Sequence, residues 1–197
     1  TIIVIEDDLI VAKNFLYFMN FFLKKYENRE EVISIHGFLF PLERKVQQNF
    51  FIVGADCWGW ATWQRGWKVF NSDSKCLLDQ LERKKLLWKF DYEGTANYTS
   101  MLRDNINGLN DSWAVRWHAS AVINNMLTLY PRESLVMNIG NDGSGVHSIK
   151  TNAYDVCFGN RKIDTSSPII KECSDNRALI RRYFLRQQSN MIYAIVK

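Results

Sequence analysis

The chain has 197 residues, of which 47% are hydrophobic, 14% aromatic and 23% charged, and its formal net charge is +4. This length suffices for one domain with its own core, and the mild positive charge suits anionic small ligands or an anionic membrane surface without requiring nucleic acid. No run of about 18 apolar residues occurs, which excludes a transmembrane helix, and no secretory signal is visible. Four widely spread cysteines without a CxxC pair favour a reduced protein with buried thiols over a zinc site or a disulfide framework.

Residues 1–8 combine an apolar run with an acidic cluster. Ile2–Ile5 consists of β-branched residues, which predicts a short strand buried on both faces, and Glu6, Asp7 and Asp8 follow at once. Open α/β sheets bind ligands at the carboxyl ends of their strands, and adjacent carboxylates are most stable near a cation or a helix N-terminus. We therefore expect a ligand site here. The alternative is that one aspartate simply caps the helix that follows.

A second alternative is the receiver domain of response regulators, which also opens with a strand that ends in an acidic pair. Asp56, which follows the apolar run Phe50–Val53, is the candidate phosphoryl acceptor for that interpretation. A receiver domain also needs a lysine near the end of a later strand, and no lysine occurs between Lys89 and Lys150. The missing charge and the tryptophan-rich middle of the chain argue against this alternative.

The next segments predict an α/β layering. Residues 9–26 carry apolar side chains at helical spacing, and Val32–His36 is predicted to be the second strand. A strand, a helix and a strand in this order favour a right-handed parallel βαβ unit. We expect His36, at the end of its strand, to be a packed histidine rather than a ligand.

All seven tryptophans lie in the middle of the chain. In the segment Gly54–Trp60, which follows the third predicted strand, small residues allow a sharp turn beside large rings. Trp58 and Trp60 are therefore candidates for stacking on a sugar ring. Trp63 and Trp67 share a predicted helical face with Trp60 and are expected to pack in the core.

The remaining elements include one further candidate for chemistry. Asp111 directly precedes a predicted helix, where it is either the N-cap or a general base that points into a cleft. The glycine-rich stretch 140–147 can bring backbone amides close to an anion, although it lacks the spacing of a Walker loop or a dinucleotide fingerprint. A final helix, at 175–196, has arginines that form either a solvated face or a contact with an anionic membrane. The other predicted elements are helices at Leu77–Phe90, Asn97–Ile106 and Ser112–Leu127, and strands at Leu127–Tyr130 and Leu135–Ile139.

Three segments in this order resemble the nucleotide-sugar-dependent glycosyltransferases of the GT-A fold. They are Val4–Leu9, then Gly54–Trp60, then Asn110–Trp113 followed by Gly143–His147. The stretch from Ile2 to His147 is similar to bacterial sugar transferases that build surface polysaccharide, and more distantly to N-acetylglucosaminyltransferase I. The resemblance implies an α/β fold with a partial GT-A, Rossmann-like mixed sheet flanked by helices.

The resemblance also implies a function, the metal-dependent transfer of a hexosyl or N-acetylhexosaminyl group with inversion. Asp111 would be the catalytic base, and Asp8 and His147 would hold Mn²⁺ or Mg²⁺ on the donor diphosphate. The donor-binding residues would be Glu6, Asp7, Gly143, Ser144 and Gly145. The acceptor and sugar sites would be lined by Trp58, Trp60, Trp113 and Arg116.

The acidic motif begins at residue 6, whereas GT-A domains place it much later, after their nucleotide-binding strands. Residues 1–149 are therefore expected to be the C-terminal portion of such a domain, and 150–197 a C-terminal extension with a basic amphipathic helix. We expect this chain to bind nucleotide sugar weakly or not at all and to be inactive alone. The expected partners are a nucleotide-sugar donor and a glycan or lipid-linked acceptor, in the cytoplasm at the inner face of the membrane. The alternative is a non-catalytic carbohydrate-binding or assembly module on the same scaffold.

Overall fold

The structure, a computed structural model, describes residues 1–140, 153–158 and 162–195. A mixed five-stranded sheet lies at its centre. Its strand order is β1-β5-β3-β6-β4, with only β3 and β6 parallel and every other neighbouring pair antiparallel. The strands are β1 (Ile2–Val4), β3 (Val32–His36), β4 (Phe50–Val53), β5 (Trp60–Thr62) and β6 (Leu127–Tyr130). The mixed sheet confirms the predicted α/β class. Its antiparallel pairs are incompatible with the wholly parallel sheet of a receiver domain.

Strand β1 is an edge strand, so the prediction that it is buried on both faces is wrong. It pairs only with β5, and Ile2 and Ile5 are 56% and 45% exposed. The four apolar residues indicated burial, but a run of this kind does not reveal how many neighbours its strand has. The strand–helix–strand prediction is correct in part. Strands β1 and β3 run in the same direction, but β5 lies between them and is antiparallel to both.

The predicted helix 9–26 is two elements. Strand β2 (Leu9–Val11) pairs with β7 (Val136–Asn138) in a separate two-stranded ribbon, and helix α1 spans Phe15–Lys25. The helix buries Phe15, Phe18 and Phe22 on one face, as the spacing predicted. The first turn was assigned wrongly because Leu9, Ile10 and Val11 fit helical spacing and a short strand equally well.

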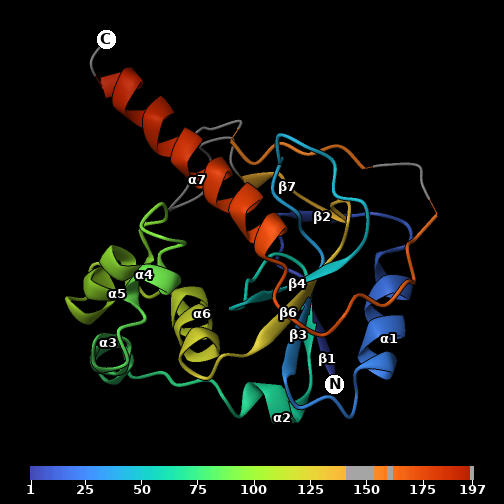
Figure 1. The fold of residues 1–197 in the computed structure, drawn as a ribbon, viewed down its shortest axis with the longest axis horizontal. Coiled ribbons are helices and arrows are strands. Elements are labelled where there is room, and N and C mark those ends of the chain that lie inside the picture. The colour runs from blue at the N-terminus through green and yellow to red at the C-terminus, as the bar shows by residue number, and fades with distance from the viewer. Residues whose placement is uncertain (141–152, 159–161, 196–197) are drawn as a thin grey trace.

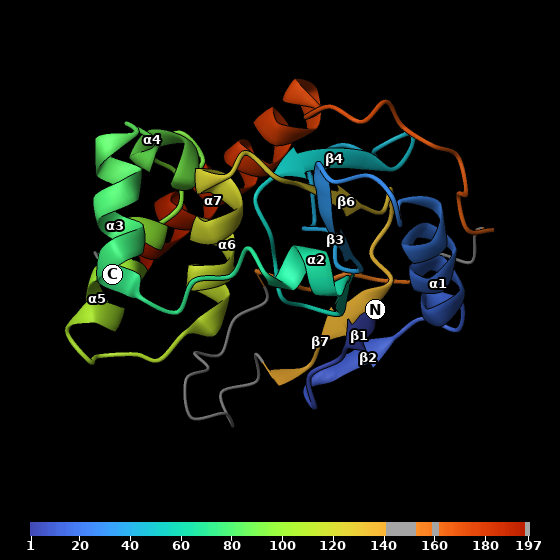
Figure 2. The same cartoon turned by 90° about the horizontal axis from the view of Figure 1, so that it is seen from below.

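Helices α3 to α6 form a lobe on one side of the sheet, and α1 lies on the other side (Figures 1 and 2). The predicted helix 77–90 is broken, because Lys85 adopts a left-handed φ of 57° between α3 and α4. Helix α5 agrees with its prediction to within one residue, whereas α6 ends at Ile123, before Asn125 turns the chain (φ 52°) into β6. The helices are α2 (Gln64–Trp67), α3 (Ser74–Arg83), α4 (Leu87–Phe90), α5 (Tyr98–Ile106) and α6 (Trp113–Ile123).

The last helix, α7 (Ser174–Ile195), packs against both the sheet and the lobe (Figure 1). Ahead of it, the Cys173 amide donates to the Phe51 carbonyl of β4, and Glu172 forms a β-bridge with Phe51. Within the helix, Ile180 and Tyr183 are buried in the main core cluster. No helix in the described part of the chain is long and apolar enough to cross a membrane.

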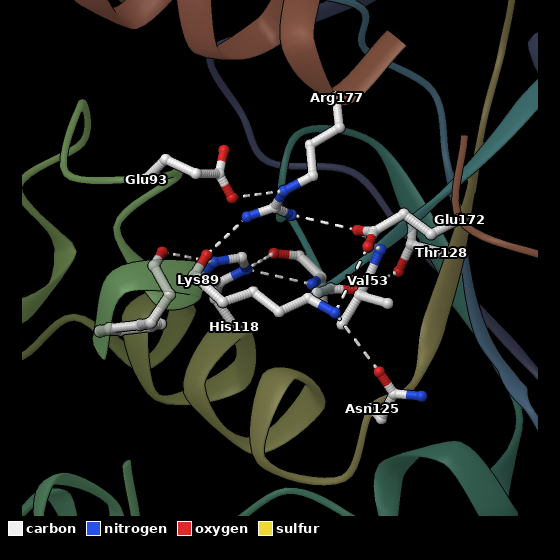
Figure 3. A network of polar contacts seen from close by, with 11 residues as sticks. Val53, Lys89, Glu93, His118, Asn125, Thr128, Glu172 and Arg177 are labelled. Carbon is white, nitrogen blue, oxygen red and sulfur yellow. Dashed lines mark hydrogen bonds and ion pairs between the residues drawn. The ribbon is translucent and has the colours of Figure 1, made fainter. Parts of the chain in front are cut away.

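A polar network fixes α7 to the lobe (Figure 3). The buried Arg177 guanidinium forms ion pairs with Glu93 at 2.9 Å and Glu172 at 3.1 Å, and it donates to the Lys89 carbonyl. It also stacks over the Tyr92 ring, 4.5 Å from the centroid. The Lys89 ammonium, 3.3 Å from Glu172, completes the network. Sheet, lobe and α7 thus share one set of charged contacts.

Candidate functional site

Carboxylates from two distant segments of the chain act on one another electrostatically. Glu6 and Asp8 follow β1, and Asp56 lies on the connection that crosses from β4 to β5, past β6 and β3. The pKa of Glu6 is raised, first because the side chain is partly buried and then because Asp8, Asp56 and Asp7 are nearby. Burial is the larger cause, and the three aspartates add a repulsion that disfavours the charged form of Glu6. Such a group favours a cation or another positively charged ligand.

Asp8 is held by the end of strand β7. Its Oδ2 accepts a hydrogen bond from the Asn138 side chain at 3.1 Å, and its carbonyl accepts from the Ile139 amide at 2.8 Å. A Cβ at position 140 would lie 2.6 Å from Oδ2, so any residue other than glycine there would displace the Asp8 side chain. The other oxygen, Oδ1, is buried and has no hydrogen-bond partner among the described residues. The N-cap of α1 is Asn14, so neither Asp7 nor Asp8 caps that helix.

Asp56 lies over the sheet face that the lobe covers. Its Oδ1 accepts from the Cys57 amide at 2.8 Å, and the Tyr130 hydroxyl is 3.5 Å from Oδ2. The His36 Nε2 is 4.0 Å from Oδ1, and His36 is fully buried. Burial lowers the pKa of His36 although Asp56 opposes the effect, so the ring is neutral at pH 7. Burial and then the carboxylates raise the pKa of the Cys57 thiol, which makes it a poor nucleophile.

An aromatic pocket of about 220 Å³ adjoins Asp56. Its walls come from the β4–β5 connection, α5, the start of α6, the segment 153–158 and α7. The lining residues include Asp56, Trp58, Tyr98, Ser112, Tyr154 and Phe184. Aromatic walls with one carboxylate suit a sugar ring, which has an apolar face and polar edges, and the volume suits a single ring.

His118 of α6 fixes the backbone of the turn that carries Asp56. Its Nε2 is 3.2 Å from the Phe90 carbonyl oxygen, and its Nδ1 is 3.0 Å from the Ala55 carbonyl oxygen and 3.2 Å from the Ala55 amide nitrogen. A neutral ring donates to one of the two carbonyls, according to its tautomer. The ring is buried, and burial is the main cause that lowers its pKa to about 4. A Cβ at Gly54, where φ is +128°, would lie 2.5 Å from this ring. Turn and helix therefore interlock, and this constraint is invisible in the sequence.

The predicted tryptophans separate into two environments. Trp58 lines the pocket and packs edge-on against Tyr154, with ring centroids 4.9 Å apart. Trp60 is 3% exposed and packs against Trp113, Trp67 and Trp117 in an indole cluster on the other side of the turn. Of the three tryptophans predicted to contact sugar, only Trp58 lines this pocket. Because Trp60 lies in β5, the prediction that it shares one helical face with Trp67 is wrong, although their rings do touch.

Asp111 and Arg116 form an ion pair at the start of α6. Arg116 Nη2 is 3.0 Å from Asp111 Oδ1, and the Asp111 side chain is 95% exposed. Asp111 does not cap the helix, because Ser112 is the N-cap and accepts from the Val115 amide. Ser112 lines the aromatic pocket, but Asp111 itself does not. The proposed base therefore lies one residue from the pocket lining, with its carboxylate in solvent.

The other predicted donor and metal residues, Gly143, Ser144, Gly145 and His147, lie outside the described residues. Within the described ranges, no group of three His, Cys, Asp or Glu side chains is arranged to hold a metal ion. The four cysteines are free, but the prediction of buried thiols is wrong, because Cys57, Cys76 and Cys173 are half-buried and Cys157 is exposed.

Comparison of the chain with protein-family models, with curated proteins and with solved structures gave no match.

Proposed function

We propose that this chain carries the catalytic part of a metal-dependent inverting glycosyltransferase of the GT-A type. Such an enzyme moves a hexosyl or N-acetylhexosaminyl group from a nucleotide-diphosphate donor to a hydroxyl of a glycan or lipid-linked acceptor, here in bacterial surface-polysaccharide synthesis. The observation that supports this most is an aromatic pocket of sugar size that has one carboxylate, Asp56, in its lining. The charge of Asp56 also acts on Glu6 of the acidic motif. Carboxylates for a cation and rings for a sugar are the two halves that this chemistry needs.

Asp8 is the residue that fits a metal ion. Its buried Oδ1 lacks a partner, and a hard cation such as Mn²⁺ or Mg²⁺ prefers a carboxylate oxygen. The lack of a three-residue cage among the described residues is compatible with this role, since Mg²⁺ is often held by one or two carboxylates plus substrate phosphates. The metal would neutralise charge that develops on the leaving diphosphate. Glu6 and Asp7, with Gly143, Ser144, Gly145 and His147, would complete the donor site.

Asp111 is the proposed general base. Arg116 occupies Oδ1, and Oδ2 has no hydrogen bond to the described residues, so Oδ2 is available to take the proton of the acceptor hydroxyl. The acceptor oxygen would then bond to the anomeric carbon as the bond to the diphosphate breaks. Arg116 acts in this account by orienting Asp111, and Ser112 places the start of α6 against the pocket.

The test uses two readouts and three variants. Asp8→Asn should weaken Mn²⁺ binding, measured by calorimetry with uridine diphosphate present. Asp111→Asn should leave that binding unchanged but lower sugar transfer by an enzyme that contains this chain by about a hundredfold or more. Asp79→Asn, which removes an exposed carboxylate on α3, is the control and should change neither. Full transfer activity in Asp111→Asn would remove the assignment of the base.

The second candidate is a carbohydrate-binding or assembly module without catalysis. It is favoured by the solvent-exposed position of Asp111, outside the pocket that would hold the acceptor. It predicts glycan binding that does not depend on Mn²⁺ and that survives Asp8→Ala but not Trp58→Ala. The same two measurements therefore distinguish it from the enzyme.

The proposed setting is the cytoplasm, at the inner face of a membrane that presents the acceptor. Contact with anionic lipid would use Arg181, Arg182 and Arg186, which α7 exposes. Arg177 cannot take part, because it is buried between Glu93 and Glu172.

A further inference from the structure

Two hollows outside the carboxylate site join into one concave surface. The first, of about 320 Å³, lies at one end of the β2/β7 ribbon, where the Ala12 amide donates a hydrogen bond to the Leu135 carbonyl. Asp8 lies at the other end of this ribbon. The second, of about 510 Å³, lies beside the loop between β3 and β4. They share the lining residues Arg132, Glu133, Ser134 and Phe158, so they adjoin, and we call them together the basic trough.

The trough is positively charged. Among the described residues, its lining includes five cationic residues, Lys13, Arg44, Lys45, Arg132 and Lys162, and two carboxylates, Glu133 and Asp155. Lys13, Arg44 and Lys45 are exposed and form no ion pair with the described residues. Uncompensated like charges in a concave surface focus a positive potential and favour an anionic occupant.

The trough leads to the aromatic pocket. Phe40, which is buried, lines both the second hollow and the pocket that contains Asp56 and Trp58, so these two hollows also adjoin. A chain whose terminal sugar occupies the pocket can therefore continue past Phe40 into the trough. The described lining of the pocket has one carboxylate, Asp56, and no lysine or arginine, whereas cations outnumber carboxylates in the trough, so the two hollows differ in the sign of their charge.

The geometry points to an acidic glycan as the acceptor, with its neutral reacting end in the aromatic pocket and its anionic sugars along the basic trough. This inference rests on the proposed function, because it assigns the substrate class of the same site. A concave path that adjoins the pocket suits a glycan chain better than a membrane, since a planar lipid surface would not reach cations on the walls of a hollow.

The probes are a fluorescently labelled hexauronate and labelled maltohexaose, which is neutral, measured by fluorescence anisotropy on the 197-residue chain. The hexauronate should bind at least about tenfold tighter at low salt, and this preference should shrink towards physiological ionic strength. Arg44→Glu/Lys45→Glu should weaken hexauronate binding by about tenfold or more. Lys68→Glu/Lys75→Glu, which makes the same charge change on exposed residues outside the trough, should change it less than about twofold.

Equal affinity for hexauronate and maltohexaose overturns the inference. So does an equal loss of hexauronate affinity in Arg44→Glu/Lys45→Glu and in Lys68→Glu/Lys75→Glu. If Arg44→Glu/Lys45→Glu fails to fold, Lys13→Glu/Lys162→Glu tests the other hollow with the same expected loss. Charge-dependent binding to phosphatidylglycerol vesicles without hexauronate binding would assign the trough to a membrane and also refute it. If Asp8→Asn bound Mn²⁺ as tightly as the unaltered protein in the calorimetric test, that result would count against the proposed function. Failure of the acidic-glycan inference and failure of the proposed function are therefore distinguishable.

Discussion

Removal of the Arg177 guanidinium should destabilise the protein strongly. Arg177→Ala leaves the Glu93 carboxylate without its cation and leaves Glu172 with Lys89 alone, while the Lys89 carbonyl loses a donor. Removing one partner of a fully buried pair typically costs about 3–5 kcal/mol. The glutamate side chains are 22% and 23% exposed, and Lys89 remains, so we expect about 2–4 kcal/mol.

The assay is urea unfolding followed by circular dichroism. Arg181→Ala is the matched control, because Arg181 is exposed one turn further along α7 and forms no ion pair with the described residues, and it should change stability by less than about 0.5 kcal/mol. Arg177→Met made together with Glu93→Gln and Glu172→Gln should be less harmful than Arg177→Met alone, because no carboxylate is then left unpaired. A loss for Arg177→Ala no larger than that for Arg181→Ala would refute the view that this network joins α7 to the lobe.

Two further predictions concern the turn and the ring behind the pocket. Gly54→Ala should cost roughly 2–4 kcal/mol, because its Cβ would lie 2.5 Å from His118 at a φ of +128°, whereas Gly108→Ala, with φ +73° and open space around it, should cost only about 1–2 kcal/mol. Equal losses in urea unfolding would show that the contact with His118 is unimportant. His118 should titrate in the folded protein with a pKa of about 4, as read from its ring proton signals by NMR. Since this lies below the unfolded value of about 6.5, the stabilisation is complete above pH 6.5 and is lost as pH falls towards 4, by up to roughly 3 kcal/mol. A folded-state pKa near 6.5 would contradict the buried, neutral tautomer.

The sequence predicted local elements better than their neighbours in space. Strands β3, β4 and β6 and helix α5 were found because their apolar patterns are short and bounded by turn residues. Strand β7 was predicted, but its pairing with β2 was missed. This pairing joins residues more than 120 positions apart, and no local pattern encodes it. The same limit explains why β1 was expected to be buried on both faces.

The candidate site shows the same division. The acidic motif placed Glu6 and Asp8 at the end of β1 as predicted, but the support of Asp8 by Asn138 and Gly140 could not be foreseen. Asp56 was considered only as a phosphoryl acceptor. Its approach to Glu6 depends on a connection that crosses the sheet, and strand order is needed to see this. Gly54 was the one signal in the sequence that could have drawn attention to the turn that carries Asp56, since a glycine directly after a strand suggests an unusual turn.

The bridge between Glu172 and β4 has a consequence for biosynthesis. Strand β4 ends the sheet, and the backbone groups of Phe51 that face away from β6 are covered by residues 172 and 173. During translation this edge stays unpaired until residues 172 and 173 have left the ribosome. An unpaired strand edge is a template for aggregation. Nascent chains that stall before residue 172 should therefore be the form that most needs a chaperone.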